Sequence, residues 1–378
     1  MRTKRTTSGI YFRRGELVSA AFSPYTGSVF AVDPQFNSVL NEWLDCRPAE
    51  VPPEIATVLG AGWAPGSGRN SRPTRHILPD EGWGFSNALD RPLVINWLLT
   101  GNCAYECPYC YAQDLMNGRC REPKEADVKR IAKEILSFDP VAVVLTGGDP
   151  LLSPHLRYAI ELLHEKAGVI VDTSGFGIND KQIESFRDHR VFVRISLDSE
   201  LGKKSSELRP MKARRDTDTG DIALQSIQKC MSHDVNLGVQ TVITAVNYGD
   251  LESLGIKLHK LGVCYWRIML LAHTAETDKV FQKLRFTDTN DTRFRKNIYP
   301  KLKGLFDSSK DAAVLVQLAE NDVPNAVILV SPDGVFYTES ATGNGKRVID
   351  PSNRTKPTEA AMRTNVDMYA HARRYLCE

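Results

Sequence analysis

Three closely spaced cysteines are the residues of this chain most able to do chemistry. Cys103, Cys107 and Cys110 form a C-x3-C-x2-C run within the segment CAYECPYC. Thiolates are soft ligands that suit iron-sulfur clusters or zinc, so the run predicts a metal centre. A closed zinc site needs a fourth protein ligand, and Cys120 lies too far along the chain for ordinary finger spacing. Three ligands alone leave one iron of a cluster open to an external molecule.

The composition limits the class of protein around these cysteines. With 378 residues, 42% hydrophobic and 25% charged, the chain has room for two or three domains. Its net charge of +2 gives no field that favours nucleic acid or a membrane as the main partner. Its eight cysteines are too dilute for a disulfide scaffold. Because no apolar run reaches the roughly 18 residues of a membrane span and the basic start is not followed by an apolar signal core, we expect a cytoplasmic protein.

The elements that must position the cysteines begin near residue 92. Strand and helix patterns alternate from there, with a helix predicted over 124–137. Six β/α units imply an α/β fold with a parallel sheet, and they are too few for the closed eight-unit barrel, so an open or partial barrel fits better. The predicted strands span residues 93–100, 141–146, 168–173, 191–198, 236–244 and 263–271.

Placed after the first of these strands, the cysteine loop resembles that of the radical S-adenosylmethionine (SAM) superfamily. The hallmark of that superfamily is a C-x3-C-x-aromatic-C loop in a partial (β/α)6 barrel, and Tyr109 fills the aromatic position. The resemblance implies that Cys103, Cys107 and Cys110 hold one [4Fe-4S] cluster and that SAM binds its open iron. It further implies reductive cleavage of SAM to a 5′-deoxyadenosyl radical, with an electron donor such as flavodoxin or ferredoxin.

A second match follows the second predicted strand. Gly147-Gly148-Asp149-Pro150 stands where the family carries a Gly-Gly-Glu-Pro-like motif, with Asp in place of the commoner Glu. A Gly-Gly pair lets the backbone come close to a ligand, and the resemblance implies that this ligand is the SAM amino group.

The fourth predicted strand has one apolar face and one largely polar face, which should look into the barrel. Ser196 begins a Ser-Leu-Asp-Ser stretch that resembles the Ser-Leu-Asp-Gly stretch of the peptide- and sulfatase-modifying branch. In that branch the serine contacts SAM and an arginine about a dozen residues on meets its carboxylate, which implies Arg209 here. Three other basic residues of the same loop are alternatives: Lys204, Lys212 and Arg214. From the alternation in the last two strands we predict that Gln240, Tyr265 and Arg267 face the substrate.

The two ends of the chain bear on the substrate. Residues 1–63 read as three strands (10–13, 16–22, 28–32) and two helices, near 36–43 and 55–59. This order resembles the small winged-helix-like domain (RRE, PqqD-like) that captures leader peptides in ribosomal-peptide (RiPP) biosynthesis, often by strand addition. A purely structural cap or an oligomer contact is the alternative. Residues 64–91 have the composition of a linker.

The barrel is predicted over residues 92–275, and residues 276–378 resemble the C-terminal (SPASM-like) domain of peptide-modifying members. The hairpin over 327–338 supports this resemblance, but only Cys377 remains after Cys264. Auxiliary clusters cannot be built from one cysteine, so we expect a cluster-free cap.

Three functions remain open from the sequence. The leading hypothesis is a radical SAM enzyme that modifies a precursor peptide carrying a leader, by crosslinking, epimerisation or a related reaction. The alternative is a radical SAM enzyme acting on a small metabolite such as a sugar or nucleoside. The third is a non-catalytic metal-binding module. No catalytic residue beyond the SAM site stands out.

Overall fold

The structure, a computed structural model, describes residues 4–5, 11–13, 15, 19–25, 27–32, 89–116, 118–263, 265–307, 315–319, 325–339 and 345–376. The two helices predicted near 36–43 and 55–59, and most of the predicted linker, lie outside the described residues.

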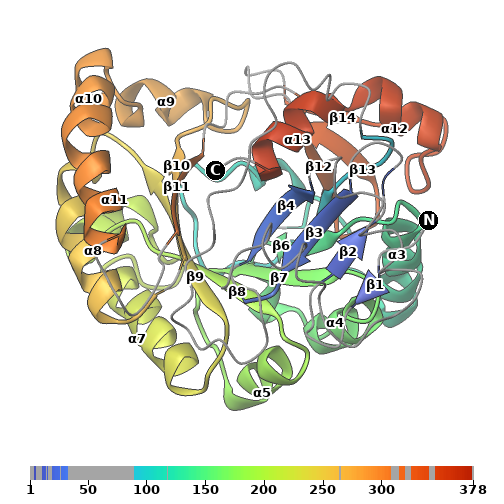
Figure 1. The fold of residues 1–378 in the computed structure, drawn as a ribbon, viewed down its shortest axis with the longest axis horizontal. Coiled ribbons are helices and arrows are strands. Elements are labelled where there is room, and N and C mark those ends of the chain that lie inside the picture. The colour runs from blue at the N-terminus through green and yellow to red at the C-terminus, as the bar shows by residue number, and fades with distance from the viewer. Residues whose placement is uncertain are drawn as a thin grey trace.

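Six parallel strands form the wall of a partial barrel, which confirms the predicted α/β fold (Figure 1). Each strand lies within two residues of its predicted bounds, because long apolar runs rich in Val, Ile and Leu mark strands buried on both faces. The strands are β5 (Val94–Thr100), β6 (Ala142–Gly147), β7 (Gly168–Thr173), β8 (Phe192–Ser196), β9 (Leu237–Ile243) and β10 (Tyr265–Leu270).

Amphipathic helices cover the outer face of these strands (Figure 1). In α3 the apolar face that packs inward includes Val128, Ile131 and Ile135, as its spacing predicts. Local caps fix where others begin: the Asn179 side chain accepts from the Gln182 N–H at the start of α5. No helix of the described residues is long and apolar enough to cross a membrane. The helices between the strands are α3 (Glu125–Ser137), α4 (Leu156–Leu163), α5 (Asp180–Asp188), α6 (Gly202–Leu208), α7 (Thr219–Ser232) and α8 (Leu251–Lys260).

The C-terminal segment extends the barrel sheet at both edges. β11 pairs in parallel with β10, while β12 pairs in parallel with β5 and continues into an antiparallel meander. The prediction of a cap over the barrel did not include these pairings, since they join segments far apart in the sequence. The elements are α9 (Asp278–Leu284), α10 (Asp288–Arg293), α11 (Tyr299–Asp307), β11 (Leu315–Ala319), β12 (Val327–Val330), β13 (Phe336–Glu339), β14 (Lys346–Val348), α12 (Glu359–Asn365) and α13 (Met368–Leu376).

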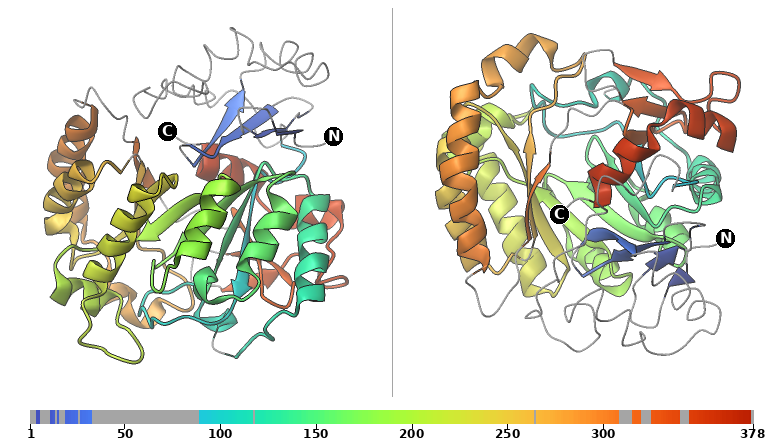
Figure 2. Two further views of the ribbon diagram at one scale, coloured as in Figure 1. Left: turned by 90° about the horizontal axis from the view of Figure 1, so that it is seen from below. Right: turned by 45° about the horizontal axis from the view of Figure 1, so that its top comes forward.

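A four-stranded antiparallel sheet at the N-terminus lies across the end of the barrel where the strands begin (Figure 2). Phe22 packs so tightly on Gly168, the first residue of β7, that a Cβ there would lie 1.9 Å from its ring. Arg13 donates to the carbonyl oxygens of Pro92 and Asp139, at 2.5 and 3.3 Å, just before β5 and β6. The sheet is therefore part of the barrel's packing. Its strands are β1 (Lys4–Arg5), β2 (Tyr11–Arg13), β3 (Ser19–Ser23) and β4 (Ser28–Val32).

Helix α13 reaches the barrel interior from the same end. His371 is fully buried: its Nε2 accepts from the Leu93 N–H at 2.9 Å and its Nδ1 donates to the Ala326 carbonyl at 2.7 Å. One turn further, the Tyr375 hydroxyl accepts from the Asn96 side chain at 2.8 Å. These contacts attach α13 to β5, so the N-terminal ends of the strands are covered and the interior opens toward the other end.

Candidate active site

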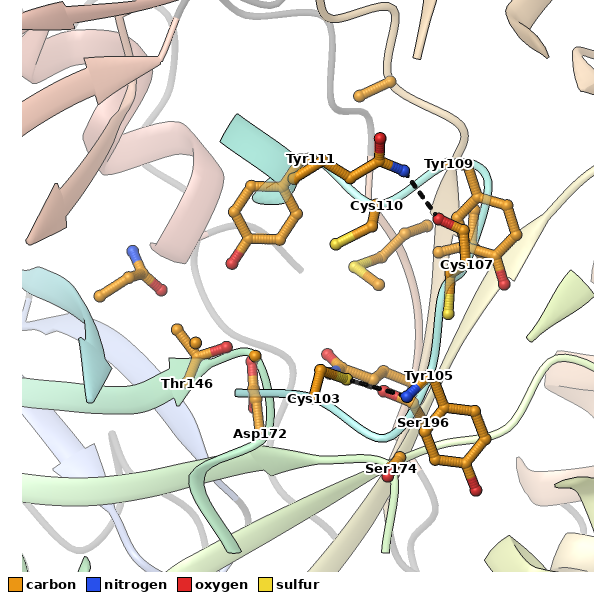
Figure 3. Close-up of a pocket in the computed structure, with 18 of the residues that line it drawn as sticks. Cys103, Tyr105, Cys107, Tyr109, Cys110, Tyr111, Thr146, Asp172, Ser174 and Ser196 are labelled. Atoms are coloured by element: carbon orange, nitrogen blue, oxygen red, sulfur yellow. Dashed lines mark hydrogen bonds between the residues drawn. The ribbon is translucent and has the colours of Figure 1, made fainter. Parts of the chain in front are cut away.

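A cavity of about 670 Å³ occupies the barrel interior, and the three cysteines line it. The cysteine loop follows β5, where the carboxyl ends of parallel strands point, so it lies at the end opposite the N-terminal sheet. Figure 3 shows Cys103, Cys107 and Cys110 around one space, with Tyr111 and Thr146 across it. The structure thus brings together the thiols that their spacing singled out.

A second segment, which follows α6, holds the cysteine loop in place. Tyr105 forms an isolated antiparallel bridge with Met211. On either side of this bridge the Glu106 N–H donates to the Pro210 carbonyl and the Lys212 N–H donates to the Ala104 carbonyl, both at 2.9 Å. The Lys212 ammonium also donates to the Cys103 carbonyl at 2.9 Å. Lys212, one of the alternatives for binding SAM, therefore contacts the loop backbone.

The donor set suits an iron-sulfur cluster. Burial raises the pKa of Cys103 and Cys107 to about 12 and that of Cys110 to about 11, so the free thiols keep their protons at neutral pH and release them when metal binds. Within the described residues, no three His, Cys, Asp or Glu side chains are close enough to hold one metal ion. Thiols spread along the wall of a cavity fit a cluster, in which each thiolate binds a separate iron.

The Gly147-Gly148 pair lets two backbones meet. A Cβ on Gly148 would lie 2.0 Å from the Asn102 carbonyl oxygen, and Gly147 has a φ of +136° and faces the Thr100 carbonyl. The Gly148 N–H donates to Thr100 O at 2.8 Å and the Asp149 N–H to Asn102 O at 2.7 Å. Both glycines also line the cavity. From the sequence we expected the Gly-Gly pair to make room for a ligand. In the structure, the close backbone approach at the start of the cysteine loop requires glycine at these two positions.

Asp149 is buried and its carboxylate is occupied by protein donors. It accepts from the Leu151 N–H at 3.1 Å, the Thr173 hydroxyl at 2.7 Å, and both the N–H and the hydroxyl of Ser174, at 3.0 and 2.5 Å. Burial raises the pKa of Asp149 and these hydrogen bonds oppose the rise. The carboxylate thus ties the ends of β6 and β7 together beside the cavity. Pro150 opens a short 3-10 helix and does not line the cavity, so the structure does not bring it to the site with the rest of its motif.

Ser196, Tyr109 and Arg209, which the resemblance assigns to cofactor binding, all line the cavity. Sequence reasoning assigned no role to Asp198, the buried residue that joins two of them. Its carboxylate accepts from the Tyr109 hydroxyl, from Arg209 Nε at 2.6 Å and from the Val242 N–H at 2.7 Å. Burial disfavours the guanidinium charge, but Asp198, Tyr109 and Cys107 together outweigh burial and raise the pKa of Arg209 well above its usual value. The signal for Asp198 was its place in the Ser-Leu-Asp-Ser stretch.

Two of the three residues predicted to face the substrate line the cavity, Gln240 and Arg267. Tyr265 does not line it, so the structure does not bring this residue to the other two. It is buried near the strand starts, where it packs edge-on against Phe192 at a ring-centroid distance of 5.8 Å and crowds Gly238. Alternation along β10 gives the face on which a side chain lies, but not its depth in the barrel.

Sequence reasoning missed several other polar residues of the cavity wall. Asn96 is a polar residue within the apolar strand β5, which is a usable signal for an inward-facing position. Tyr111 directly follows the last cysteine of the run. Those from the C-terminal segment could not be found without the long-range pairings that bring them in: Glu339, Arg374 and Tyr375.

The comparisons agree with this geometry. The family model of the radical SAM superfamily matches residues 97–254, which include the cysteine loop, the Gly-Gly motif and the fourth barrel strand. The chain contains a radical SAM domain. Enzymes of this superfamily use a [4Fe-4S] cluster and SAM, in agreement with the predicted cofactors.

Curated relatives of this chain share low sequence identity with it. An S-adenosylmethionine-dependent nucleotide dehydratase from Lacinutrix mariniflava is 21% identical over 68% of this chain and 52% of its own length. A GTP 3′,8-cyclase from Clostridium perfringens is 29% identical over 38% of this chain and 45% of its own length. The match therefore spans about half the length of each.

Solved structures share the fold. SuiB of Streptococcus suis bound to its precursor peptide SuiA has a TM-score of 0.57 at 13% identity and covers 89% of this chain and 82% of its own. The enzyme anSMEcpe with bound AdoMet and the Kp18Cys peptide has a TM-score of 0.59 at 13% identity and covers 74% and 82%.

Proposed function

We propose that this chain is a radical SAM enzyme that modifies a ribosomally synthesised precursor peptide by hydrogen-atom abstraction. The observation that carries the radical chemistry is that three thiols and the Gly147-Gly148 pair line one cavity. A cluster held by these thiols would supply the electron for the reductive cleavage of SAM to methionine and a 5′-deoxyadenosyl radical. An electron donor such as flavodoxin or ferredoxin would reduce the cluster.

The chain's own residues would bind and orient these groups. Cys103, Cys107 and Cys110 would hold the cluster, and Ser196 and Arg209 would contact SAM beside it. The Asp198 carboxylate fixes Arg209 and the Tyr109 hydroxyl in one arrangement, so both would meet SAM already oriented. The covered end of the barrel would exclude water from the radical.

The peptide substrate is supported by the N-terminal sheet and by the fold shared with two enzymes whose solved structures hold peptides. Because Phe22 and Arg13 of this sheet pack against the barrel, deleting residues 1–63 would expose buried surface and confuse loss of recognition with loss of folding. The intact chain should instead be co-expressed with a candidate precursor peptide, with Cys107→Ala as the control. A mass change of the peptide that needs Cys107 is expected. An unmodified peptide would count against the peptide substrate alone.

A small anionic molecule is the second candidate substrate. Two observations favour it: the cavity is closed at the end covered by α13, and the curated relatives named above act on nucleotides. The reconstituted enzyme with SAM and dithionite should then convert added nucleoside triphosphates, detected by liquid chromatography and mass spectrometry. Turnover of a nucleotide with no modification of any peptide would favour this candidate over the first.

A further inference from the structure

A buried arginine without a counter-charge lies in the wall of the cavity. Arg267 on β10 is 6% exposed, and its Nε is buried with no hydrogen-bond partner. No acidic side chain of the described residues lies within ion-pair distance of its guanidinium. An unpaired buried charge is strongly unfavourable, so such a group is rare unless a ligand supplies its counter-charge.

The neighbours of Arg267 build a polar wall around it. In the sheet register Arg267 lies beside Gln240, which lies beside Ser196, so the three side chains form one row across β10, β9 and β8. Arg374 of α13 lines the same cavity. Burial lowers the pKa of Arg267; Tyr265 opposes this shift, and the charges of Arg194 and Arg374 add to it.

Two carboxylates of the cavity wall, Asp172 and Glu339, do not pair with Arg267. Asp172 accepts from Arg194 through both oxygens, at 2.6 and 2.9 Å, in a bidentate pair that leaves Arg267 out. Glu339 lies on β13, beyond β5 in the strand order, and its buried Oε1 has no hydrogen-bond partner among the described residues. Burial raises its pKa, while Lys346 and then Arg374 favour its charge. Within the part of the chain that the structure describes, Arg267 therefore has no carboxylate of the cavity wall as its counter-charge.

We propose that Arg267, in a row with Gln240 and close to Arg374, binds an anionic oxygen group of the substrate, either a carboxylate or a phosphate. A planar guanidinium with amide and hydroxyl groups beside it matches both kinds of oxygen. This assignment rests on the proposed function, since it takes the cavity to be the substrate site. It names the substrate chemistry that the cavity selects: an acidic side chain or C-terminal carboxylate of a peptide, or the phosphate of a nucleotide.

The test uses the full-length, reconstituted protein saturated with SAM and without reductant. Isothermal titration calorimetry would measure the binding of inorganic pyrophosphate and of succinate to the wild type, Arg267→Met, Arg267→Lys and Arg157→Met. Arg157 is an exposed arginine paired with Glu161 and serves as a control for the loss of one charge.

We expect Arg267→Met to weaken binding of the preferred probe by about tenfold or more, the effect of losing one charge-assisted hydrogen bond. Arg267→Lys should keep most of the affinity and Arg157→Met all of it. Preference for pyrophosphate would identify a phosphate-bearing substrate, and preference for succinate a carboxylate-bearing one. Equal affinity of the wild type and Arg267→Met for both probes would overturn the proposal.

Two further readouts separate this role from others. If Arg267 awaits a ligand, Arg267→Met should raise the melting temperature of the ligand-free protein, because an unpaired buried charge is removed. A lower melting temperature would show that the side chain only supports the fold. The Kd for SAM should be unchanged in Arg267→Met, and its loss would assign Arg267 to the SAM carboxylate instead. Retained 5′-deoxyadenosine formation in a variant that no longer binds anions would contradict neither the radical chemistry nor the proposed function.

Discussion

Replacing Gly148 by alanine should damage the cluster site through the backbone alone. The added Cβ would lie 2.0 Å from the Asn102 carbonyl oxygen and 2.4 Å from its carbonyl carbon, and neither backbone atom can rotate away. Moving the two segments apart would lengthen the hydrogen bonds from Gly148 to Thr100 and from Asp149 to Asn102. Overpacking of this kind costs about 1–3 kcal/mol and each backbone hydrogen bond about 1 kcal/mol, so we expect a loss of about 3–5 kcal/mol in the free energy of unfolding.

The assay is anaerobic urea denaturation of the protein without its cluster, followed by iron analysis after reconstitution. Because Asn102 precedes Cys103, the displaced backbone should also lower the iron bound per chain. Gly249→Ala is the matched control: a Cβ there meets nothing within 4 Å, so its effect should stay within about 0.5 kcal/mol. The reasoning is refuted if Gly148→Ala matches Gly249→Ala in both stability and iron content.

Three further changes test other parts of the structure. Asp198→Asn leaves the buried Arg209 without its counter-charge. It should lower the free energy of unfolding by about 3–5 kcal/mol and slow 5′-deoxyadenosine formation. If both values stay unchanged, the Asp198–Arg209 pair is not needed. Burial lowers the pKa of His371 to about 4, so below about pH 6.5 the unfolded chain binds more protons than the folded protein. The free energy of unfolding should therefore fall by about 2 kcal/mol from pH 7 to pH 5 in the wild type and by less in His371→Gln. An equal fall in both proteins would contradict this. Phe22→Ala should destabilise the whole protein in a single transition by about 3–5 kcal/mol, whereas a loss below about 1 kcal/mol would mean that the N-terminal sheet is an independent unit.

The barrel strands could be predicted because their signal is local. Runs such as Val94–Thr100 and Gly168–Thr173 combine β-branched residues with clear ends, and the structure places them almost as predicted. The edge strands could not be assigned in this way. Leu315–Ala319 pairs with β10, and Val327–Val330 pairs with β5. The sequence of neither segment indicates which distant strand it pairs with.

The candidate site divides in the same manner. The cysteines could be found because ligand spacing in a single loop is a local pattern, and Gln240 and Arg267 because alternation defines a face. Alternation gives no depth, so it could not show that Tyr265 packs against Phe192 outside the cavity lining. Partners of the site that come from α13 depend on tertiary packing, which one sequence does not reveal.

Anaerobic reconstitution with iron and sulfide, followed by incubation with SAM and dithionite, decides whether the three cysteines hold a catalytic cluster. We expect a brown protein with about four irons per chain that forms 5′-deoxyadenosine, and a Cys107→Ala variant that loses iron and activity together. A colourless protein that binds zinc tightly and leaves SAM intact would contradict this expectation.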